Sequence, residues 1–583
     1  MIHSRSSRPT IRLSVPPQIS PWARMSRRFV SAPAACAAAA LLATTLAAPA
    51  AVAATPDQTD RRGGSSSQLT LAPVGTYSAG VFDESAAEIV AYYGKRVYTV
   101  NALAGAVDVI DVTNPSAPTK LYSIAGSGVA NSIALRRDGL GVIALEAPVK
   151  TDPGSLVFFD ARSAASAPIL GSVTAGAQPD MVAFSPDGRY VLSANEGEPN
   201  DEYTVDPEGS VSVVTVARTV KAPGQADVRT ADFHAFETGG TKMLEPTVRV
   251  FAGIPGSLNP VSANLEPEYI TVDGRTAYVT LQEANAVAVV DVRTAKVEKI
   301  LPLGFKDLSI AGNGIDPSDR DPKGAPTINI RTFPGLFGMY MPDAIASYSS
   351  RGETYLVTAN EGDAREWGSY EEGARVADLN VCATSPLAAL TGAADLGRLN
   401  VTTENGFNEA SGCYDTLYAF GARSFSIWTT GGRQVFDSGE SLERVTAAAN
   451  PAFFNSNHTA SNLEGRSDDK GPEPEGVAIG EIQGRTYAFI GLERVGGIAV
   501  YDITDPRRTS FVTYVNNRDF SVSVEDAVDT DAALGAAGDL GPEGVTFIDG
   551  RVSPTGKPML AVGNEVSGTT TLFSINLERV RRE

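Results

Sequence analysis

The sequence predicts an all-β protein, a seven-bladed β-propeller closed by an N-terminal strand, with eight blades as the alternative. Three observations predict this fold. A phrase joining proline, an acidic residue and an apolar strand recurs, most clearly as GPEPEGVAIG at 471–480 and LGPEGVTFI at 540–548. Further short apolar or alternating segments follow each copy, as half-buried strands require. The segment LTLAPVGTY at 69–77 stands alone before the first unit, whereas the last unit ends after three strands.

The repeated phrase predicts the start of the innermost strand of each blade. Proline lacks a backbone donor and fixes φ, so it suits the residue just before a strand. Seven segments fit this position: AAEIVAY at 86, VANSIAL at 129, QPDMVAF at 178, EPEYITV at 266, MPDAIAS at 341, EPEGVAI at 473 and GPEGVTF at 541. Four short strands in each unit of roughly 40 to 50 residues are typical of propeller blades. An eighth blade would have to lie within 219–262 or 415–450.

The first 54 residues differ from the rest of the chain. They contain six arginines, no acidic residue and the run AACAAAALLATTLAAPAAVAA, which predicts a secretory signal peptide at 1–54 with Met25 as an alternative start. Export by the Sec pathway is expected, with SRRFV leaving the twin-arginine route as the alternative. A flexible linker at 55–67 then precedes one propeller domain at 68–583, with insertions near 196–209, 237–265, 361–415 and 440–472.

Composition restricts the function. The chain carries a formal net charge of -20, which excludes nucleic acid as an expected partner. After the signal, no segment approaches the roughly 20 apolar residues of a membrane helix, and LFSINLERVRRE at the C-terminus carries no sorting motif or anchor. A secreted, extracellular protein is expected. Cys382 and Cys413 are the two cysteines left after cleavage, and an oxidising compartment predicts a disulfide between them.

Acidic residues recur at two positions of the repeat, at the start of the first strand and at the end of the second. Antiparallel pairing brings these positions to one rim, so we expect an acidic mouth there. The start acids are Glu88, Asp180, Glu268, Asp343, Glu475 and Glu543, and the strand-end acids are Glu146, Glu196, Glu283, Glu361, Glu493 and Glu565. Asn195, Asn360 and Asn564 add neutral oxygen ligands, and Arg365 and Arg494 are candidates to hold phosphate oxygens.

Three interpretations of these acids are open. They cap turns and bind backbone amides, they hold a divalent cation, calcium or magnesium, or they form an acidic pocket without a cation. Crowded carboxylates raise one another's pKa unless cations or donors neutralise them, and hard cations prefer oxygen ligands. A separate segment, DPSDRDPKG at 316–324, places three aspartates close together but lacks the spacing and the closing glutamate of an EF-hand.

Several catalytic mechanisms are disfavoured. Only His234 and His458 follow the predicted signal, and the sequence contains no GxSxG, HExxH or phosphate-binding Gly-Lys motif. A histidine-rich zinc site or a Ser-His-Asp triad is therefore not expected, and no organic cofactor is evident.

The motifs ANEGEPNDEY, LEPEYITV, TANEGDARE, RSDDKGPEPEGV and GPEGV, in this order, resemble the choice-of-anchor I family of secreted bacterial proteins. Its animal relatives are called mesenchyme-specific cell-surface glycoproteins, and the resemblance implies a YVTN or WD40-like propeller over roughly 70–583. The family supplies no catalytic residues to transfer. Some related chains are labelled alkaline phosphatase or phytase-like.

We therefore expect an extracellular binding or scaffold propeller whose acidic mouth holds a divalent cation and presents a surface to an extracellular ligand. The alternative is a metal-dependent phosphoesterase that uses the same mouth on a phosphorylated small molecule, with metal ions clamping the phosphate and activating water. A third possibility is an adhesion or matrix component without a small ligand.

Overall fold

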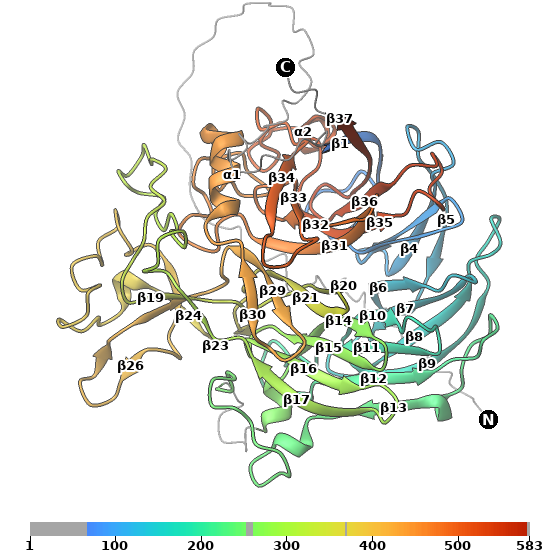
Figure 1. Ribbon diagram of the computed structural model, residues 1–583, viewed down its shortest axis with the longest axis horizontal. Helices are drawn as coiled ribbons and strands as arrows, with labels where there is room; N and C mark the ends of the chain where they lie inside the picture. Colours follow the sequence, from blue (N-terminus) through green and yellow to red (C-terminus); the bar gives the residue numbers. More distant parts are fainter. Residues whose placement is uncertain (1–66, 252–259, 368–369, 580–583) are drawn as a thin grey trace, which may run out of the picture. The chain divides into compact units, whose positions relative to one another are not determined.

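The structure is a computed structural model that describes residues 67–251, 260–367 and 370–579. The predicted signal peptide and all but the last residue of the predicted linker lie outside these residues. The regular secondary structure of the described chain consists almost entirely of short β-strands (Figure 1).

Seven four-stranded sheets contain most of the strands. We name them sheets 1 to 7 in chain order. Sheet 1 consists of β2 (Val90–Tyr93), β3 (Arg96–Asn101), β4 (Ala106–Asp111) and β5 (Thr119–Ala125), and sheet 2 of β6 (Val129–Leu135), β7 (Leu140–Glu146), β8 (Pro153–Asp160) and β9 (Ile169–Ala177). Sheet 3 consists of β10 (Pro179–Phe184), β11 (Tyr190–Asn195), β12 (Ser210–Thr215) and β13 (Val228–Ala231). Sheet 4 consists of β14 (Pro267–Asp273), β15 (Thr276–Leu281), β16 (Ala286–Asp291) and β17 (Lys296–Pro302).

Sheets 5 to 7 include the two ends of the described chain. Sheet 5 consists of β20 (Ile345–Ser350), β21 (Glu353–Asn360), β29 (Ser424–Thr429) and β30 (Gln434–Asp437). Sheet 6 consists of β31 (Pro474–Ile482), β32 (Arg485–Leu492), β33 (Ile498–Asp502) and β34 (Ser510–Val515). Sheet 7 consists of β35 (Pro542–Ile548), β36 (Met559–Asn564), β37 (Thr569–Arg579) and β1 (Ser67–Ser78). β1 pairs antiparallel with β37, as expected for the lone N-terminal strand. The segments 219–262 and 415–450 supply outer strands of sheets 3 and 5, and their described residues form no further four-stranded sheet.

Consecutive sheets pack against each other through apolar side chains. A separate buried cluster lies between each sheet and the next, and one of these clusters joins sheet 7 to sheet 1. That cluster contains Val90, Val97 and Ile110 of sheet 1 with Ile548, Met559 and Leu572 of sheet 7. The innermost strands also contact one another in the same cyclic order. The architecture is all-β and propeller-like.

Burial changes from the inner to the outer strands of a sheet. Every residue of β3 and β36 is buried, whereas in β5 only Ile124 is buried and β17 mixes buried with exposed residues. The inner strands are covered on both faces by neighbouring sheets, so they are apolar almost throughout, and the outer strands meet solvent on one side.

The repeated phrase forms a β-bulge at the start of the first strand. Pro474 pairs with Leu492 and pairing resumes between Val477 and Ile490, so two residues of β31 face one residue of β32. Sheets 3, 4 and 7 have the same register shift directly after the proline. The glycine that follows the acid in sheet 6 is required by space, because a Cβ on Gly476 would lie 2.0 Å from the Glu543 carbonyl oxygen. The phrase therefore combines a turn, a bulged acid and close packing of adjacent innermost strands.

The long insertions contain regular secondary structure of their own. Residues from 303–340 and 361–423 together form a five-stranded sheet, which we call the inserted sheet, in the order β18 (Phe305–Asp307), β19 (Leu336–Met339), β28 (Leu417–Ala419), β25 (Asn400–Thr402) and β24 (Gly373–Arg375). It has its own apolar core, which includes Leu308, Phe333, Leu387, Leu399 and Leu417. The sequence predicted an insertion at 361–415 but not the contribution of 303–340.

The remaining described elements lie in the insertions and connections. They are the short pairs β22 (Glu366–Trp367) with β23 (Tyr370–Glu371) and β26 (Phe407–Asn408) with β27 (Cys413–Tyr414), the helices α1 (Ser441–Ala449) and α2 (Thr530–Ala537), and the 3₁₀ turns η2 (Gln225–Asp227), η3 (His234–Phe236), η4 (Val261–Asn264), η5 (Val376–Asp378) and η6 (Pro451–Phe453). Among the described residues, no helix has the length and apolar character needed to cross a membrane.

Cys382 and Cys413 form the predicted disulfide, beside the core of the inserted sheet. They are 31 residues apart in sequence. Replacing both with serine is expected to cost about 3 to 4 kcal/mol through the larger entropy of the unfolded chain. Because the inserted sheet has a separate core, hydrogen exchange should accelerate mainly in β19, β25 and β28. Sheets 1 to 3 serve as the internal control, and equal acceleration there would contradict a local role for the disulfide.

Candidate functional site

The start acids and strand-end acids of the acidic mouth lie at one edge of their sheets. In sheet 6, the N–H of Glu493 donates to the carbonyl of Glu473, the residue before the proline, at 2.8 Å. Glu196 and Glu565 make the same backbone contact to Gln178 and Gly541. The bulged start acid is thus beside the strand-end acid of its own sheet, because the hydrogen bond closes that end of the strand pair.

Acids from different sheets also converge. Burial and then the charges of Glu88 and Glu565 raise the pKa of Glu543 well above its usual range, with Asp343 and Asp180 adding to the effect. Burial and the charges of Glu493 and Glu361 act in the same direction on the pKa of Glu475. Within this group Tyr269 has its pKa raised by burial and then by Asp343 and Glu543, so the phenol stays protonated.

Three carboxylates between sheets 7 and 1 form one compact, purely acidic group. Glu88, Glu543 and Glu565 each place one carboxylate oxygen so that the three atoms lie within 4.8 Å of one another. All three side chains are half-buried. In the described part of the chain, none of the three forms an ion pair with lysine, arginine or histidine. Burial, with a contribution from the charge of Asp180, raises the pKa of Glu88 to about 8.

A second acidic group differs because basic side chains accompany it. Glu361, Glu475 and Glu493 also place one oxygen each within 4.8 Å of one another. Lys470 Nζ lies 2.6 Å from Glu361 Oε1, and Arg494 Nε lies 2.9 Å from Glu493 Oε2. This half of the mouth is therefore partly neutralised by protein groups.

Glu473 holds the basic side chains in place. It is fully buried, and its carboxylate lies 2.6 Å from Arg466 Nη2, 3.3 Å from Lys470 Nζ and 3.0 Å from Arg494 Nε. Burial alone would raise the pKa of Glu473, but the charges of Arg466, Lys470 and Arg494 outweigh it and hold the pKa far below its usual range. Glu473 stands in the repeated phrase, but it was not among the residues predicted to be functional.

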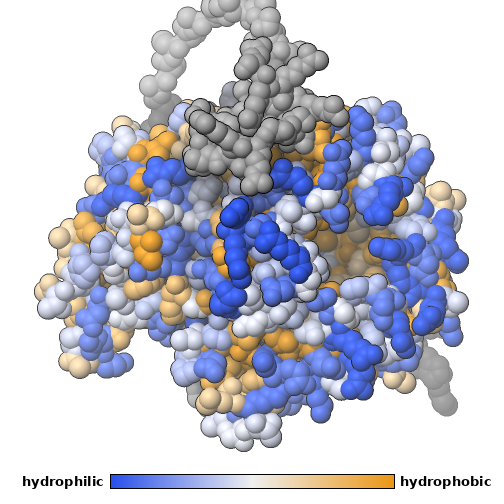
Figure 2. All heavy atoms as spheres, viewed as in Figure 1, coloured by the Kyte–Doolittle hydropathy of each residue, from blue (hydrophilic) through white to orange (hydrophobic). Residues whose placement is uncertain are grey.

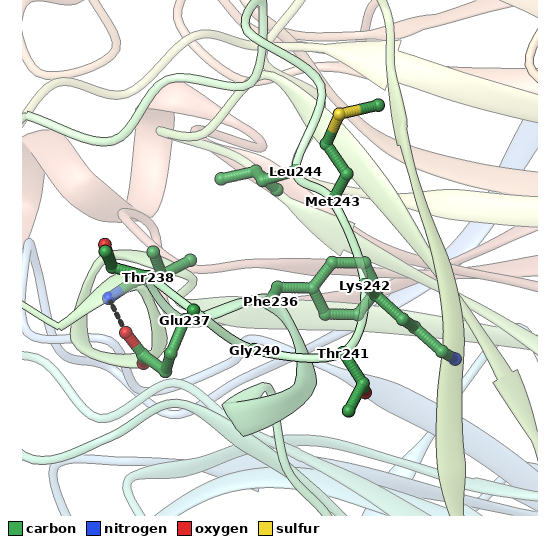
Figure 3. Close-up of a pocket in the computed structure, with 10 residues that line it drawn as sticks. Phe236, Glu237, Thr238, Gly240, Thr241, Lys242, Met243 and Leu244 are labelled. Atoms are coloured by element: carbon green, nitrogen blue, oxygen red, sulfur yellow. Dashed lines mark hydrogen bonds between the residues drawn. The ribbon is translucent and has the colours of Figure 1, made fainter.

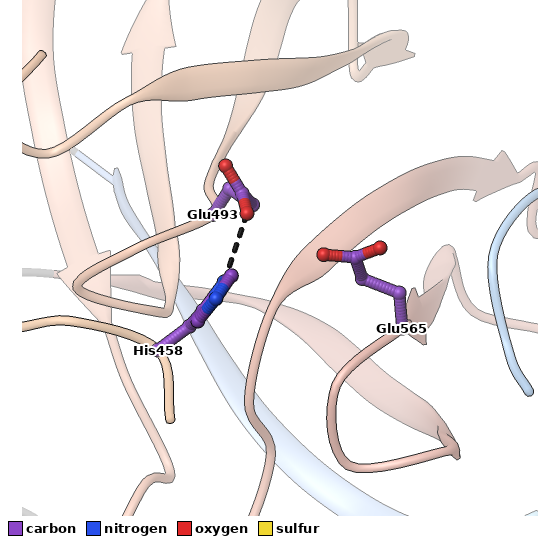
Figure 4. Close-up of side chains that lie close together, drawn as sticks. All are labelled: His458, Glu493 and Glu565. Carbon is purple, nitrogen blue, oxygen red and sulfur yellow. Dashed lines mark hydrogen bonds and ion pairs between the residues drawn. The ribbon is translucent and has the colours of Figure 1, made fainter. Parts of the chain in front are cut away.

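His458 joins the mouth from the insertion before β31 (Figure 4). Its Nδ1 lies 2.9 Å from Glu493 Oε1, and Arg494 Nη1 donates to its Nε2 at 2.7 Å. Burial and then the charge of Arg494 lower the pKa of His458, although Glu493 opposes this effect. A nitrogen of His458 and oxygens of Glu493 and Glu565 lie within 4.8 Å of one another, so they form a mixed nitrogen and oxygen group. Its position in a long loop gave no sequence signal for this contact.

Sheet 4 contributes two acids with unsatisfied oxygens. Glu268 and Glu283 are each 8% exposed, and the Oε2 atom of each lacks a hydrogen-bond partner. Burial and then the charge of Glu283 raise the pKa of Glu268. A buried carboxylate without donors is unfavourable unless it binds a proton or a cation. At the strand-end position of this sheet stands Gln282, which donates to Glu361 Oε2 at 2.9 Å, and Glu283 is one residue further on.

The remaining predicted acids stand at the strand ends of sheets 2, 3 and 5. Burial and then Glu198 raise the pKa of Asp180 to about 7, and the same two causes raise the pKa of Glu196 and of Glu146. Burial and Glu361 raise the pKa of Asp343. In sheet 2 the start position holds Asn131 in place of an acid, at the register shift of β6.

The three strand-end asparagines brace their sheets. The Nδ2 groups of Asn195, Asn360 and Asn564 donate to hydroxyls of the third strand, Ser212 Oγ at 3.0 Å, Ser426 Oγ at 2.9 Å and Thr569 Oγ1 at 3.1 Å. Each asparagine precedes a strand-end acid, and successive side chains of a strand point to opposite faces. The structure therefore gives their Nδ2 groups sheet contacts, and the ligand role expected of their oxygens stays a prediction.

Arg365 also differs from the expectation of a phosphate-binding group. Its side chain is fully buried, and Nε and Nη2 both donate to Glu266 Oε2, at 3.0 and 2.9 Å. Nη2 further donates to the Asn264 carbonyl at 2.7 Å. This guanidinium links the insertion before β14 to the one after β21, whereas Arg494 does lie in the mouth.

A surface pocket of about 580 Å³ lies away from the acidic mouth (Figure 3). Phe236, Glu237, Lys242 and Met243 are among its lining residues. Glu237 accepts the N–H groups of Val261 and Ser262 at 2.8 and 2.9 Å, so this acid has a structural task. On the face shown in Figure 2, hydrophilic residues surround separate small hydrophobic areas.

Comparison with known proteins places the chain in a family. Relatives are gigasin-3a of Magallana gigas, 31% identical over 31% of this chain and 64% of that protein, and the mesenchyme-specific cell surface glycoprotein of Strongylocentrotus purpuratus, 31% identical over 44% of this chain and 37% of that protein. The chain thus spans less than two thirds of either relative.

Solved structures that resemble the fold include the WD40 domain of Toxoplasma gondii coronin, 9% identical with a TM-score of 0.41 over 88% of both chains. A streptogramin B lyase is 8% identical with a TM-score of 0.38 over 88% of this chain and 98% of that chain. The family model described as choice-of-anchor I domain matches residues 88–506, more than half of the sequence. The chain belongs to the choice-of-anchor I family.

Proposed function

We propose that the protein is an extracellular binding or scaffold propeller whose acidic mouth binds a divalent cation, calcium or magnesium, and presents a surface to an extracellular ligand. In this proposal the seven sheets are seven blades, and pairing of β1 with β37 closes the ring. Packing between sheets 7 and 1 supports the closure. The disulfide and the name of the sea-urchin relative, a cell surface glycoprotein, support an extracellular location.

The group of Glu88, Glu543 and Glu565 carries the proposal. Three half-buried carboxylates with oxygens within 4.8 Å of one another repel each other strongly when ionised. Calcium prefers six to eight oxygen ligands and magnesium six, and both neutralise such groups. The orphan Oε2 of Glu475, whose pKa the charges of Glu543 and Glu565 help to raise, adds an acceptor. We infer that the cation lies between sheets 7 and 1, where no basic side chain of the described residues pairs with these acids.

The alternative function is metal-dependent hydrolysis of a phosphate ester in the same mouth. Lys470 and Arg494 lie next to carboxylates, as a phosphate clamp beside metal ions requires. Glu473, however, forms ion pairs with the side chains of both Lys470 and Arg494, and would compete with a phosphate for them. The binding function is therefore the better supported of the two.

The double substitution Glu543→Gln and Glu565→Gln tests the proposed cation site. Chelator-treated wild-type protein is expected to bind calcium in a calorimetric titration and to melt at a higher temperature when calcium is present. At a free calcium concentration of 100 times the Kd, the free energy of unfolding should rise by about 2.7 kcal/mol. The variant should lose one equivalent of calcium because two of the three ligands lose their charge.

Glu409→Gln, a change of an exposed glutamate in the inserted region, is the matched control. Unchanged calcium stoichiometry in the double variant would refute this site. The same samples assayed with a generic phosphate ester separate the two functions, because turnover that disappears with chelator would favour the phosphoesterase.

A further inference from the structure

We propose that the edge of the mouth at sheets 1 and 2 docks a polypeptide segment of an extracellular partner, one that carries both basic and aliphatic side chains. We call this surface the open rim, and it consists of residues 83–85, 102–105, 126–129 and 147–152. The inference rests on the proposed binding function. It adds the side from which the partner approaches and the chemistry of that partner.

The open rim is low because short connections join the strands of sheets 1 and 2 at the mouth edge. These connections are 102–105, 126–128 and 147–152. Longer connections surround the mouth edge of the other sheets, at 196–209, 361–423, 438–473 and 516–541. Leu103 and Val149 are exposed, so the longer connections leave the open rim uncovered.

Backbone contacts join the segments of the open rim into one surface. The N–H of Ala102 donates to the carbonyl of Ser85 at 3.0 Å, and the N–H of Gly126 donates to the carbonyl of Gly105 at 3.0 Å. The next strand, β6, pairs with β7, and 147–152 follows β7 directly. The open rim is therefore continuous from the segment before sheet 1 to the middle of sheet 2.

Aliphatic side chains occupy the middle of the open rim. The exposed fractions of Leu103, Val129 and Val149 are 54%, 37% and 56%. Ala104 and Pro148 beside them are exposed as well. Single exposed aliphatic side chains are common on soluble proteins. Here, however, they stand on three segments that adjoin one another, so they form an apolar strip.

The charges at the two ends of this strip are acidic. Asp83 and Glu84 are exposed at one end, and Asp152 is exposed at the other. Lys150 is the only basic residue of the open rim, and its Nζ lies 3.3 Å from Glu198 Oε2. Within the described part of the chain, the three exposed acids form no ion pair. The strip thus has uncompensated negative charge at both ends.

This combination selects the class of partner. The exposed acids repel nucleic acids and anionic membrane surfaces. A small amine would pair with one acid but would leave the apolar strip, which crosses two sheets, exposed to water. A polypeptide segment with basic side chains on either side of aliphatic ones complements both features. Its charges would speed association, and its aliphatic contacts would slow dissociation.

Two synthetic peptides of equal length and charge test the apolar strip. One alternates leucine with lysine and the other alternates serine with lysine, and fluorescence anisotropy in calcium-containing buffer measures their binding. Wild-type protein should bind the leucine peptide at least tenfold more tightly. Leu103→Asn combined with Val149→Asn should abolish this preference. Ile169→Asn is the matched control, because Ile169 is 55% exposed at the opposite edge of sheet 2, and it should keep the preference.

Asp83→Asn combined with Asp152→Asn tests the acidic ends. This variant should weaken binding of both peptides by a similar factor, at least fivefold, and reduce the salt dependence of binding, because it removes charge and keeps the apolar strip. Asparagine suits the backbone of Asp83, whose φ is 55°. An unchanged calcium stoichiometry in each rim variant shows that the variant is folded.

Equal affinity of wild-type protein for the two peptides would overturn the inference, as would a preference that persists in Leu103→Asn with Val149→Asn. The mouth variant, Glu543→Gln with Glu565→Gln, should keep the preference for leucine because its changes lie outside the open rim. Calcium stoichiometry decides the cation site and the peptide preference decides the open rim, so failure of one is distinct from failure of the other.

Discussion

Replacing Glu473 with glutamine is expected to destabilise the protein by about 3 to 5 kcal/mol, the range found when one partner of a buried ion pair is removed. Glu473 is fully buried and contacts Arg466, Lys470 and Arg494. A neutral amide would leave these three positive charges close together without the carboxylate that they share. Each would keep another carboxylate partner: Asp469 for Arg466, Glu361 for Lys470 and Glu493 for Arg494. Urea denaturation measures the effect as a lower midpoint at an unchanged slope.

Glu481→Gln is the matched control because Glu481 is exposed on the same strand, β31. It should change stability by less than about 0.5 kcal/mol, as expected for an exposed position. Adding Arg466→Gln to Glu473→Gln should cost less than the sum of the two single changes, since the pair no longer contains an uncompensated charge. Strict additivity of the two substitutions would contradict the account of Glu473 as the partner that holds the cations.

The sequence predicted the strands and the acidic edge because both depend on local patterns. Apolar segments of strand length follow each copy of the repeated phrase, and antiparallel pairing requires that the start of one strand lies beside the end of the next. The role of the strand-end asparagines within their sheets was not predicted, because their Nδ2 groups donate to hydroxyls of the third strand, a contact that the repeat spacing does not specify.

The residues that the sequence did not assign come from long-range contacts. His458 reaches Glu493 from an insertion 35 residues earlier in the sequence, beyond any periodic pattern. Arg365 precedes an acid in sequence, but its partner in space is Glu266, 99 residues earlier. The inserted sheet likewise joins two segments that are separated by strands β20 and β21. Local spacing does not specify such pairings.

Cation-free protein is expected to lose stability as the pH rises from about 5 to 8.5. Burial, with the charge of Asp180, raises the pKa of Glu88 from 4.5 to about 8, and burial with Glu198 raises that of Asp180 from 3.8 to about 7. In this range the folded protein retains protons that the unfolded chain has released, so its stability falls with increasing pH. The stabilisation is fully present below pH 3.8 to 4.5 and is lost as the pH passes through 7 and 8.

Calcium should reverse this dependence, because the cation binds the ionised carboxylates of Glu88, Glu543 and Glu565 and competes with their protons. The calcium-induced rise in melting temperature should therefore be small at pH 5 and largest at pH 8. Thermal unfolding at pH 5, 6, 7 and 8, in resin-treated buffer with and without calcium, measures both trends. Glu543→Gln combined with Glu565→Gln should flatten both, since the variant has fewer protons to lose and fewer charges to bind the cation. Stability that is constant or increases from pH 5 to 8 without cations would show that these acids are already neutralised by protein groups, and the mouth would then have no charge left for a cation to balance.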